Sequence, residues 1–121
     1  MSKRVLVIDD DDYVRNLYRE ALEEQNFAVE TAENGKVGVK KYLSFTPDTV
    51  ILDVLMPDQE GVETIRELRK LDAAAKVIAV SGGGKIEAKN YLDMMRHFGA
   101  VETFEKPVSM EQLIASIEDH S

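Results

Sequence analysis

The feature that most constrains the fold is a regular alternation of two hydrophobic patterns along the 121-residue chain. Short runs rich in aliphatic and β-branched residues indicate buried strands at residues 5–8, 28–31, 49–52, 77–80 and 101–104. An amphipathic stretch with helical spacing follows each run. Because strands and helices alternate, we predict an α/β fold in which right-handed crossovers join parallel strands and helices cover both faces of the sheet.

The spacing of apolar residues gives each expected helix one inward face. These faces comprise Val14, Leu17, Tyr18, Ala21 and Leu22 in the first helix, Val39 and Tyr42 in the second (residues 36–44), Val62, Ile65, Leu68 and Leu71 in the third, Ala88, Tyr91, Leu92, Met95 and Phe98 in the fourth, and Leu113, Ile114 and Ile117 in the last. Ser109 precedes the last helix, and Gln112 lies three residues after Ser109, which is the pattern of a capping box.

Length and charge limit the possible functions. With 44% hydrophobic residues, residues 1–121 suit one compact domain. The net charge is −8, with 23 acidic and 15 basic residues, which argues against direct binding of nucleic acid. No apolar run approaches the length that spans a bilayer, and residues 1–4 lead into a short strand rather than a signal peptide, so we expect a cytoplasmic protein without membrane contact.

Acidic residues follow two of the expected strands. Asp9 and Asp10 come directly after the run at 5–8, and Asp53 comes directly after the run at 49–52. In open parallel sheets, ligands and chemistry collect at the carboxyl ends of the strands. Three carboxylates at that edge repel one another unless a cation lies between them or one is protonated, and a hard dication such as Mg²⁺ takes oxygen ligands. The pattern therefore favours a magnesium site.

Each of these residues also has a simpler interpretation. Acidic side chains suit the first turn of a helix, and we assign Asp11 and Asp12 to helix capping on that ground. Asp53 alone could be a turn residue before Pro57, and Lys106 with Pro107 is by itself an ordinary turn signal. Asp9 and Asp10 directly follow an expected buried strand, which favours a site role for them, whereas Asp53 and Lys106 are favoured as site residues by the joint order of the motifs along the chain.

That order resembles the receiver domain of two-component response regulators, and the single-domain chemotaxis regulators in particular. The resemblance rests on Val-Leu-Val-Ile-Asp-Asp at 5–10, Ala-Glu-Asn-Gly at 32–35, Leu-Asp-Val-Leu-Met-Pro at 52–57, Val-Ile-Ala-Val-Ser-Gly at 77–82, Gly-Ala at 99–100 and Glu-Lys-Pro at 105–107. It implies a flavodoxin-like, doubly wound sheet of five parallel strands in the order 2-1-3-4-5, with five helices.

The resemblance also implies a role for each acidic residue. Asp53 would accept a phosphoryl group from the phosphohistidine of a histidine kinase or phosphotransfer protein, or from acetyl phosphate. Asp10, Asp53 and the backbone carbonyl of Leu55 would bind Mg²⁺, and Asp9 would contribute through water. Such a protein catalyses only its own phosphorylation and dephosphorylation, so we expect no turnover enzyme.

Three further residues would complete the reacting site. Lys106 would bring its ammonium to the charge on the phosphoryl group, and the hydroxyl of Ser81 would donate a hydrogen bond to a phosphoryl oxygen. Pro107 would follow a cis peptide bond, as in the family. The phosphorylated state would then be recognised by a downstream protein on the surface formed by the fourth helix, fifth strand and fifth helix, where Met94 is a candidate contact.

The chain departs from the family at the residues that usually transmit the switch. Thr103 stands where the family commonly has Tyr or Phe, and the neighbouring Phe104 has the opposite side-chain direction on a strand. We therefore expect activation to act through the glycine-rich segment 82–84 instead.

Two alternatives belong to other classes. A pseudo-receiver would bind partners without phosphorylation, although all the expected acids and Lys106 are present. A phosphohydrolase of the haloacid dehalogenase type would use Asp9 and Asp11 as its D-x-D pair, but that assignment leaves Asp53 without a task.

Overall fold

The computed structural model describes residues 3–54, 59–82 and 85–120, without the side chains of residues 85–88. Five strands form one sheet: β1 (Arg4–Ile8), β2 (Ala28–Ala32), β3 (Thr49–Val54), β4 (Val77–Ser81) and β5 (Glu102–Glu105). All neighbouring strands pair in parallel, in the order β2-β1-β3-β4-β5. This confirms the strand order implied by the sequence motifs.

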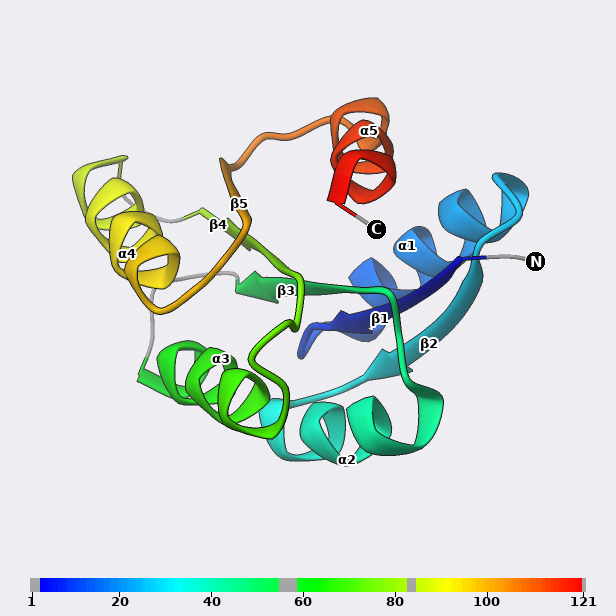
Figure 1. The fold of residues 1–121 in the computed structure, drawn as a ribbon. Helices are drawn as coiled ribbons and strands as arrows, with labels where there is room; N and C mark the ends of the chain where they lie inside the picture. Colours follow the sequence, from blue (N-terminus) through cyan, green and yellow to red (C-terminus); the bar gives the residue numbers. More distant parts are fainter. Residues whose placement is uncertain (1–2, 55–58, 83–84, 121) are drawn as a thin grey trace.

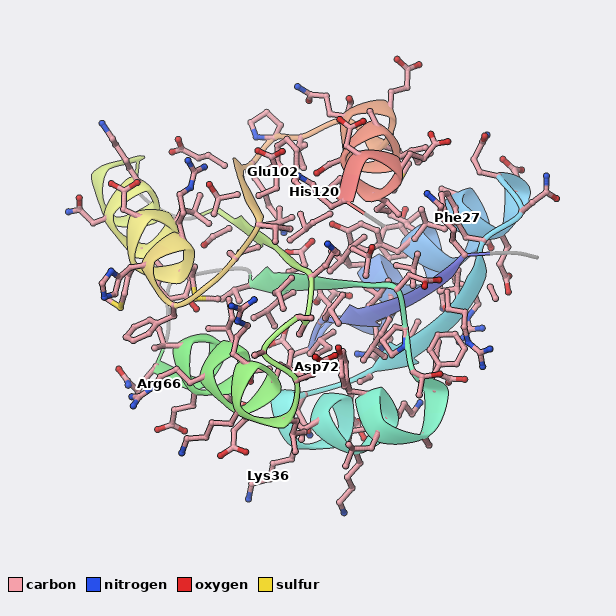
Figure 2. The ribbon with its side chains drawn as sticks, in the orientation of Figure 1. Phe27, Lys36, Arg66, Asp72, Glu102 and His120 are labelled. Atoms are coloured by element: carbon pink, nitrogen blue, oxygen red, sulfur yellow. The ribbon has the colours of Figure 1, made fainter. Side chains whose placement is uncertain are left out.

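Helices cover both faces of this sheet (Figure 1). They are α1 (Asp12–Glu24), α2 (Gly35–Phe45), α3 (Gln59–Leu71), α4 (Lys85–His97) and α5 (Met110–His120). One hydrophobic cluster joins the sheet to α1 and α5 through Tyr18, Leu22, Leu113 and Ile117. A second cluster joins the opposite face to α2, α3 and α4. Figure 2 shows the side chains that fill these two layers.

Strand β3 lies at the centre of the molecule, and all six of its residues are buried. Side chains alternate along it, so that Val50 and Leu52 face α2 and α3 while Ile51 faces α1 and α5. Full burial of a large aliphatic side chain contributes about 1.5–3 kcal/mol, so Val50, Ile51 and Leu52 help to anchor the sheet between its two helical layers. The same alternation directs the side chain of Asp53 toward the α1 and α5 face.

Polar side chains cap two helices as the sequence predicts. The Asp11 carboxylate accepts hydrogen bonds from the backbone amides of Tyr13 and Val14, at 2.8 and 3.4 Å, and forms the N-cap of α1. Before α5, the amide of Gln112 donates to the Ser109 hydroxyl at 3.1 Å, and the amide of Ser109 donates to the Gln112 side chain at 3.2 Å. Both ends are thereby satisfied in the predicted way.

Two leucines contradict the expected inward faces. Leu17 is 46% exposed and Leu71 is 44% exposed. Successive helical residues are about 100° apart, so the burial of Tyr18 and Leu22 turns Leu17 to the side of α1. Leu71 is the last residue of α3 and follows Leu68, the last buried residue of that helix, by three positions.

No helix in the described part of the chain is long and apolar enough to cross a membrane.

Candidate functional site

The site is built around Asp53, the penultimate residue of β3. Its carboxylate is 4% exposed and lies at the carboxyl edge of the sheet, between the ends of β1 and β4. Asp9, which follows β1 directly, has the same side-chain direction as Val5 and Val7 and is also 4% exposed. Because parallel strands end at the same edge, residues 44 positions apart become neighbours there.

Two described side chains contact the Asp53 carboxylate, one at each oxygen. The Lys106 ammonium lies 2.8 Å from Oδ1, as an ion pair without the directional geometry of a hydrogen bond. On the other side, the Tyr18 hydroxyl donates a hydrogen bond of 2.7 Å to Oδ2. Lys106 is placed by the end of β5, where its backbone amide donates to the Ser81 carbonyl at 2.8 Å. Its peptide bond to Pro107 is cis, as the sequence motif implies.

Asp9 has a less favourable environment. Its Oδ1 accepts one hydrogen bond, from the backbone amide of Asp11 at 2.8 Å. Burial raises the pKa of Asp9 from 3.8 to about 7, and the charges of Asp53 and Asp10 act in the same direction. The Asp11 amide and the Lys106 charge oppose this shift and do not cancel it. Asp10, by contrast, is exposed to solvent.

The donor chemistry of these acids fits Mg²⁺, although the described side chains do not yet form a coordination shell. Carboxylate oxygens are the ligands that Mg²⁺ prefers, and a dication would offset the charge that burial disfavours on Asp9. Within residues 3–54, 59–82 and 85–120, no three acidic or histidine side chains converge to metal-binding distance. The expected ligand at Leu55 lies outside the described residues.

Ser81 ends β4 at the same edge of the sheet. It is fully buried, pairs in register with Val54 and Glu105, and its hydroxyl donates to the Gly82 carbonyl at 3.3 Å. The hydroxyl therefore has a weak local partner that another acceptor can replace.

Sequence reasoning missed Tyr18, which it assigned only to the apolar face of α1. Its ring is 5% exposed in the cluster between the sheet and α1. Burial and the neighbouring Asp53 carboxylate raise its pKa far above the ordinary value, so the hydroxyl stays protonated and donates. A buried tyrosine hydroxyl usually finds a hydrogen-bond partner, and that rule is the signal that could have pointed to this contact.

A groove of about 550 Å³ leads to this carboxylate between α1 and α5. Tyr18, Asp53 and Lys106 line its polar end, and Val14, Leu17 and Met110 are among its apolar wall residues.

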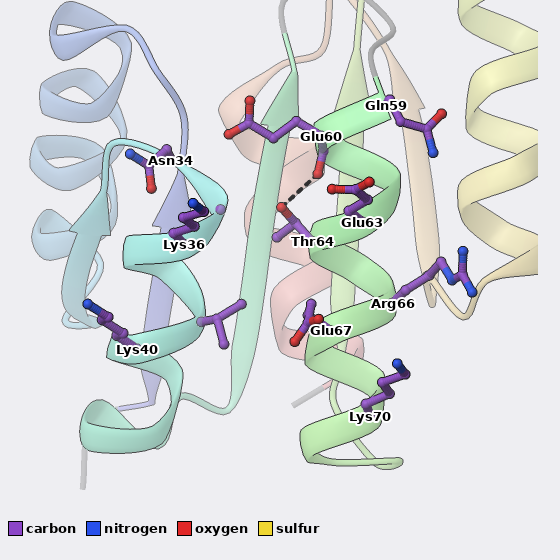
Figure 3. Close-up of a pocket in the computed structure, with 12 residues that line it drawn as sticks. Asn34, Lys36, Lys40, Gln59, Glu60, Glu63, Thr64, Arg66, Glu67 and Lys70 are labelled. Atoms are coloured by element: carbon purple, nitrogen blue, oxygen red, sulfur yellow. Dashed lines mark hydrogen bonds between the residues drawn. The ribbon is translucent and has the colours of Figure 1, made fainter.

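A second pocket, of about 1130 Å³, lies between α2 and α3 (Figure 3). Its wall carries charges of both signs, with Lys36 and Lys40 from α2 opposite Glu60 and Glu67 from α3. Thr64 approaches α2 so closely that any side chain on Gly35 would overlap it, which accounts for glycine at the end of the Ala-Glu-Asn-Gly motif. None of the residues expected to react lies in this pocket.

Thr103 and Phe104 point to opposite faces of β5, as the sequence predicts. Phe104 packs against the cluster on the α1 and α5 side, so its ring does not replace the one missing at Thr103. The Thr103 hydroxyl instead accepts a hydrogen bond of 2.7 Å from Arg96 of α4.

Comparison with known proteins gives consistent matches over nearly the whole chain. The sequence model of the response regulator receiver domain matches residues 5–118. The chemotaxis protein CheY of Halobacterium salinarum is 35% identical over 114 residues, which cover 93% of this chain and 95% of that protein. CheY of Bacillus subtilis is 30% identical and covers 97% and 96% of the two chains.

Solved structures agree with these matches. A response regulator receiver domain protein from Clostridium thermocellum superposes with a TM-score of 0.87 at 28% identity, covering 98% of this chain and 93% of that one. The response regulator TrrA from Thermotoga maritima, solved in complex with Mg²⁺ and BeF, has a TM-score of 0.82 at 33% identity and covers 98% and 99%.

Proposed function

Because the chain belongs to the response regulator receiver domain family, we propose that it accepts a phosphoryl group on Asp53 from a histidine kinase or a phosphotransfer protein. The observation that carries this proposal is the buried Asp53 carboxylate, held by the Lys106 ammonium at 2.8 Å at the carboxyl edge of the sheet. The chain is a signalling module rather than a turnover enzyme.

The reaction is an in-line displacement at phosphorus. One oxygen of Asp53 attacks the phosphoryl group, the bond from phosphorus to the donor nitrogen or oxygen breaks, and its electron pair leaves with the donor. Negative charge on the phosphoryl oxygens needs cationic neighbours, and the Lys106 ammonium already lies beside the attacking carboxylate. The Ser81 hydroxyl would exchange its weak bond to the Gly82 carbonyl for a phosphoryl oxygen.

We assign Asp10, Asp53 and the Leu55 carbonyl as the ligands of a Mg²⁺ ion, with Asp9 contributing through water. The ion would neutralise part of the phosphoryl charge. Burial, with the charges of Asp53 and Asp10, raises the pKa of Asp9 to about 7, and a dication at the site would favour the charged form of this carboxyl, which supports the assignment. In the same way, the Mg²⁺ and BeF complex of TrrA supports it by similarity.

The output surface would comprise α4, β5 and α5, on which a downstream protein distinguishes the phosphorylated form. Met94 is 45% exposed on α4, which suits the expected contact. The Arg96 to Thr103 hydrogen bond links α4 to β5 on this surface. A cytoplasmic location and the absence of membrane and nucleic-acid partners remain predictions.

The phosphohydrolase alternative loses support from the position of Asp11. That alternative needs Asp11 as the second acid of a reacting D-x-D pair, whereas its carboxylate here accepts hydrogen bonds from two backbone amides at the start of α1.

Intact-mass measurement with acetyl phosphate and Mg²⁺ tests the proposal. Wild type should gain one phosphoryl group and Asp53→Asn none, while Asp72→Asn, a change of the same kind outside the site, should behave as wild type. Label mapped to Asp9 would support the phosphohydrolase. If the wild-type chain gains no phosphoryl group and beryllofluoride does not change its amide spectrum, the protein is a pseudo-receiver.

A further inference from the structure

The Tyr18 hydroxyl is the group at the acceptor that the proposed reaction leaves without a role. The hydroxyl lies on α1, 35 positions before Asp53 in the sequence, and is 2.7 Å from Asp53 Oδ2. The ring is buried and packs in the cluster that holds α1 to the sheet. The hydroxyl is therefore held in place by the core, whereas Lys106 reaches the other oxygen with a side chain that is 29% exposed.

We propose that Tyr18 accelerates loss of the phosphoryl group by donating its hydrogen bond to the departing Asp53 carboxylate. This inference rests on the proposed function and adds to it a residue that sets the lifetime of the signal.

The chemistry of hydrolysis gives the hydroxyl its effect. A water oxygen attacks phosphorus, the bond from phosphorus to Asp53 breaks, and the electron pair returns to the carboxylate, while the water proton leaves with inorganic phosphate or solvent. Negative charge thus grows on the two Asp53 oxygens in the transition state. A donor beside Oδ2 stabilises that charge more than it stabilises the less basic acyl phosphate, so it lowers the barrier.

The same bond acts in the opposite direction during phosphorylation. The free carboxylate is the stronger acceptor. The hydrogen bond therefore stabilises it more than it stabilises the transition state, in which the carboxylate loses negative charge as it bonds to phosphorus. Tyr18 should therefore slow or leave unchanged the formation of the acyl phosphate while it speeds the loss. A purely structural role would not produce this split between the two rates.

The chain contains a matched control for this contact. Tyr42 also is a buried tyrosine, and its hydroxyl donates to Asp72 Oδ2 at the same distance of 2.7 Å. Tyr42 belongs to α2, on the opposite face of the sheet, where Asp72 is labelled in Figure 2. Tyr42→Phe consequently removes a tyrosine–carboxylate hydrogen bond of the same length, although a less buried one, without changing the surroundings of Asp53.

The experiment compares wild type, Tyr18→Phe, Tyr42→Phe and Asp53→Asn. Each chain is incubated with acetyl phosphate and Mg²⁺ while intact mass records the rate of phosphoryl uptake. The phosphodonor is then removed, and intact mass records the rate of phosphoryl loss. Removing a hydrogen bond to a developing charge should lengthen the phosphoryl half-life about tenfold in Tyr18→Phe, which corresponds to about 1.4 kcal/mol in activation free energy. Tyr42→Phe should keep the wild-type half-life, and the urea unfolding midpoints establish that both variants are folded.

The outcomes separate this inference from the proposed function. If wild type is never labelled, the proposed function falls, and this inference falls with it. If wild type is labelled at Asp53 but Tyr18→Phe loses the group at the wild-type rate or faster, only the role of Tyr18 is overturned. Equal slowing of formation and loss in Tyr18→Phe would also overturn it, because that result indicates general damage to the site.

Discussion

Asp9 and Asp53 are equally buried but differ in what surrounds their charge. Asp53 has an ammonium at one oxygen and a hydroxyl at the other, whereas Asp9 has one backbone amide and two acidic neighbours. Without metal, these surroundings therefore disfavour the charged form of Asp9. Both acids follow the same rule of strand direction, so their difference comes from neighbours on other elements.

The raised pKa of Asp9 predicts how stability depends on pH without metal. Well below pH 4 the Asp9 carboxyl is protonated in both the folded and the unfolded chain. Between about pH 4 and 7 the unfolded chain releases this proton more readily than the folded chain does. Asp9 therefore lowers the free energy of unfolding as the pH rises through this range. Asp9→Asn removes the effect. In EDTA at pH 8, the variant should have a higher urea midpoint than wild type, which corresponds to a free energy of unfolding higher by at most about 4 kcal/mol. This difference in midpoint should vanish toward pH 4.

A constant difference across that pH range would show that Asp9 does not titrate in this way. Saturating Mg²⁺ should narrow the gap at pH 8, because the ion would offset the charge in wild type.

Metal binding should depend on Asp10 more than on a neighbouring acid of equal charge. Asp10→Ala removes a proposed direct ligand, so its Mg²⁺ affinity should fall at least tenfold, about 1.4 kcal/mol. Asp12→Ala is the matched control, since Asp12 pairs with Arg15 on the surface of α1. Isothermal titration compares the two variants with wild type, and equal affinity in all three would exclude the assigned coordination.

At the scale of single elements, the N-terminus of α1 is capped by Asp11 and lies next to the site. Asp11→Ala leaves two amides without their acceptor and should lower the free energy of unfolding by about 1 kcal/mol. Asp11→Ser keeps a capping oxygen and should retain most of the stability, as measured by urea unfolding. Phosphoryl uptake should persist in both variants, and its loss in Asp11→Ser would give Asp11 a role beyond capping.

The link from β4 to α4 should carry activation, because the ring of the usual switch is absent at Thr103. Beryllofluoride should draw the Ser81 hydroxyl toward the site, and glycines after it rearrange at little steric cost. Hydrogen exchange should accordingly change most across residues 82–92, and Ser81→Ala should remove most of that change. A response concentrated at Thr103 and Phe104 would contradict this mechanism.

For the molecule as a whole, sequence periodicity predicted the parallel α/β fold and the sheet edge at which the acids lie, whereas the strand order was implied by the resemblance to the receiver domain family. Strand direction brings Asp9 and Asp53 to one edge whatever the details of packing, and the Ser109 capping box depends only on local spacing. The contact of Tyr18 with Asp53 depends on how far α1 is rotated and shifted over β3, which no local pattern determines. The exposure of Leu17 has the same origin, because that rotation turns it away from the core.

The hydrogen bond between Tyr18 and Asp53 should also make the protein an optical reporter of its own state. The chain has four tyrosines and no tryptophan, so tyrosine emission is not masked. A carboxylate that accepts a hydrogen bond from a tyrosine hydroxyl quenches its fluorescence, and conversion of Asp53 to an acyl phosphate weakens that acceptor. Ultraviolet emission should therefore rise as acetyl phosphate and Mg²⁺ act on wild type and on Tyr42→Phe, and stay constant in Tyr18→Phe. Phosphorylation could then be followed in real time without any attached dye.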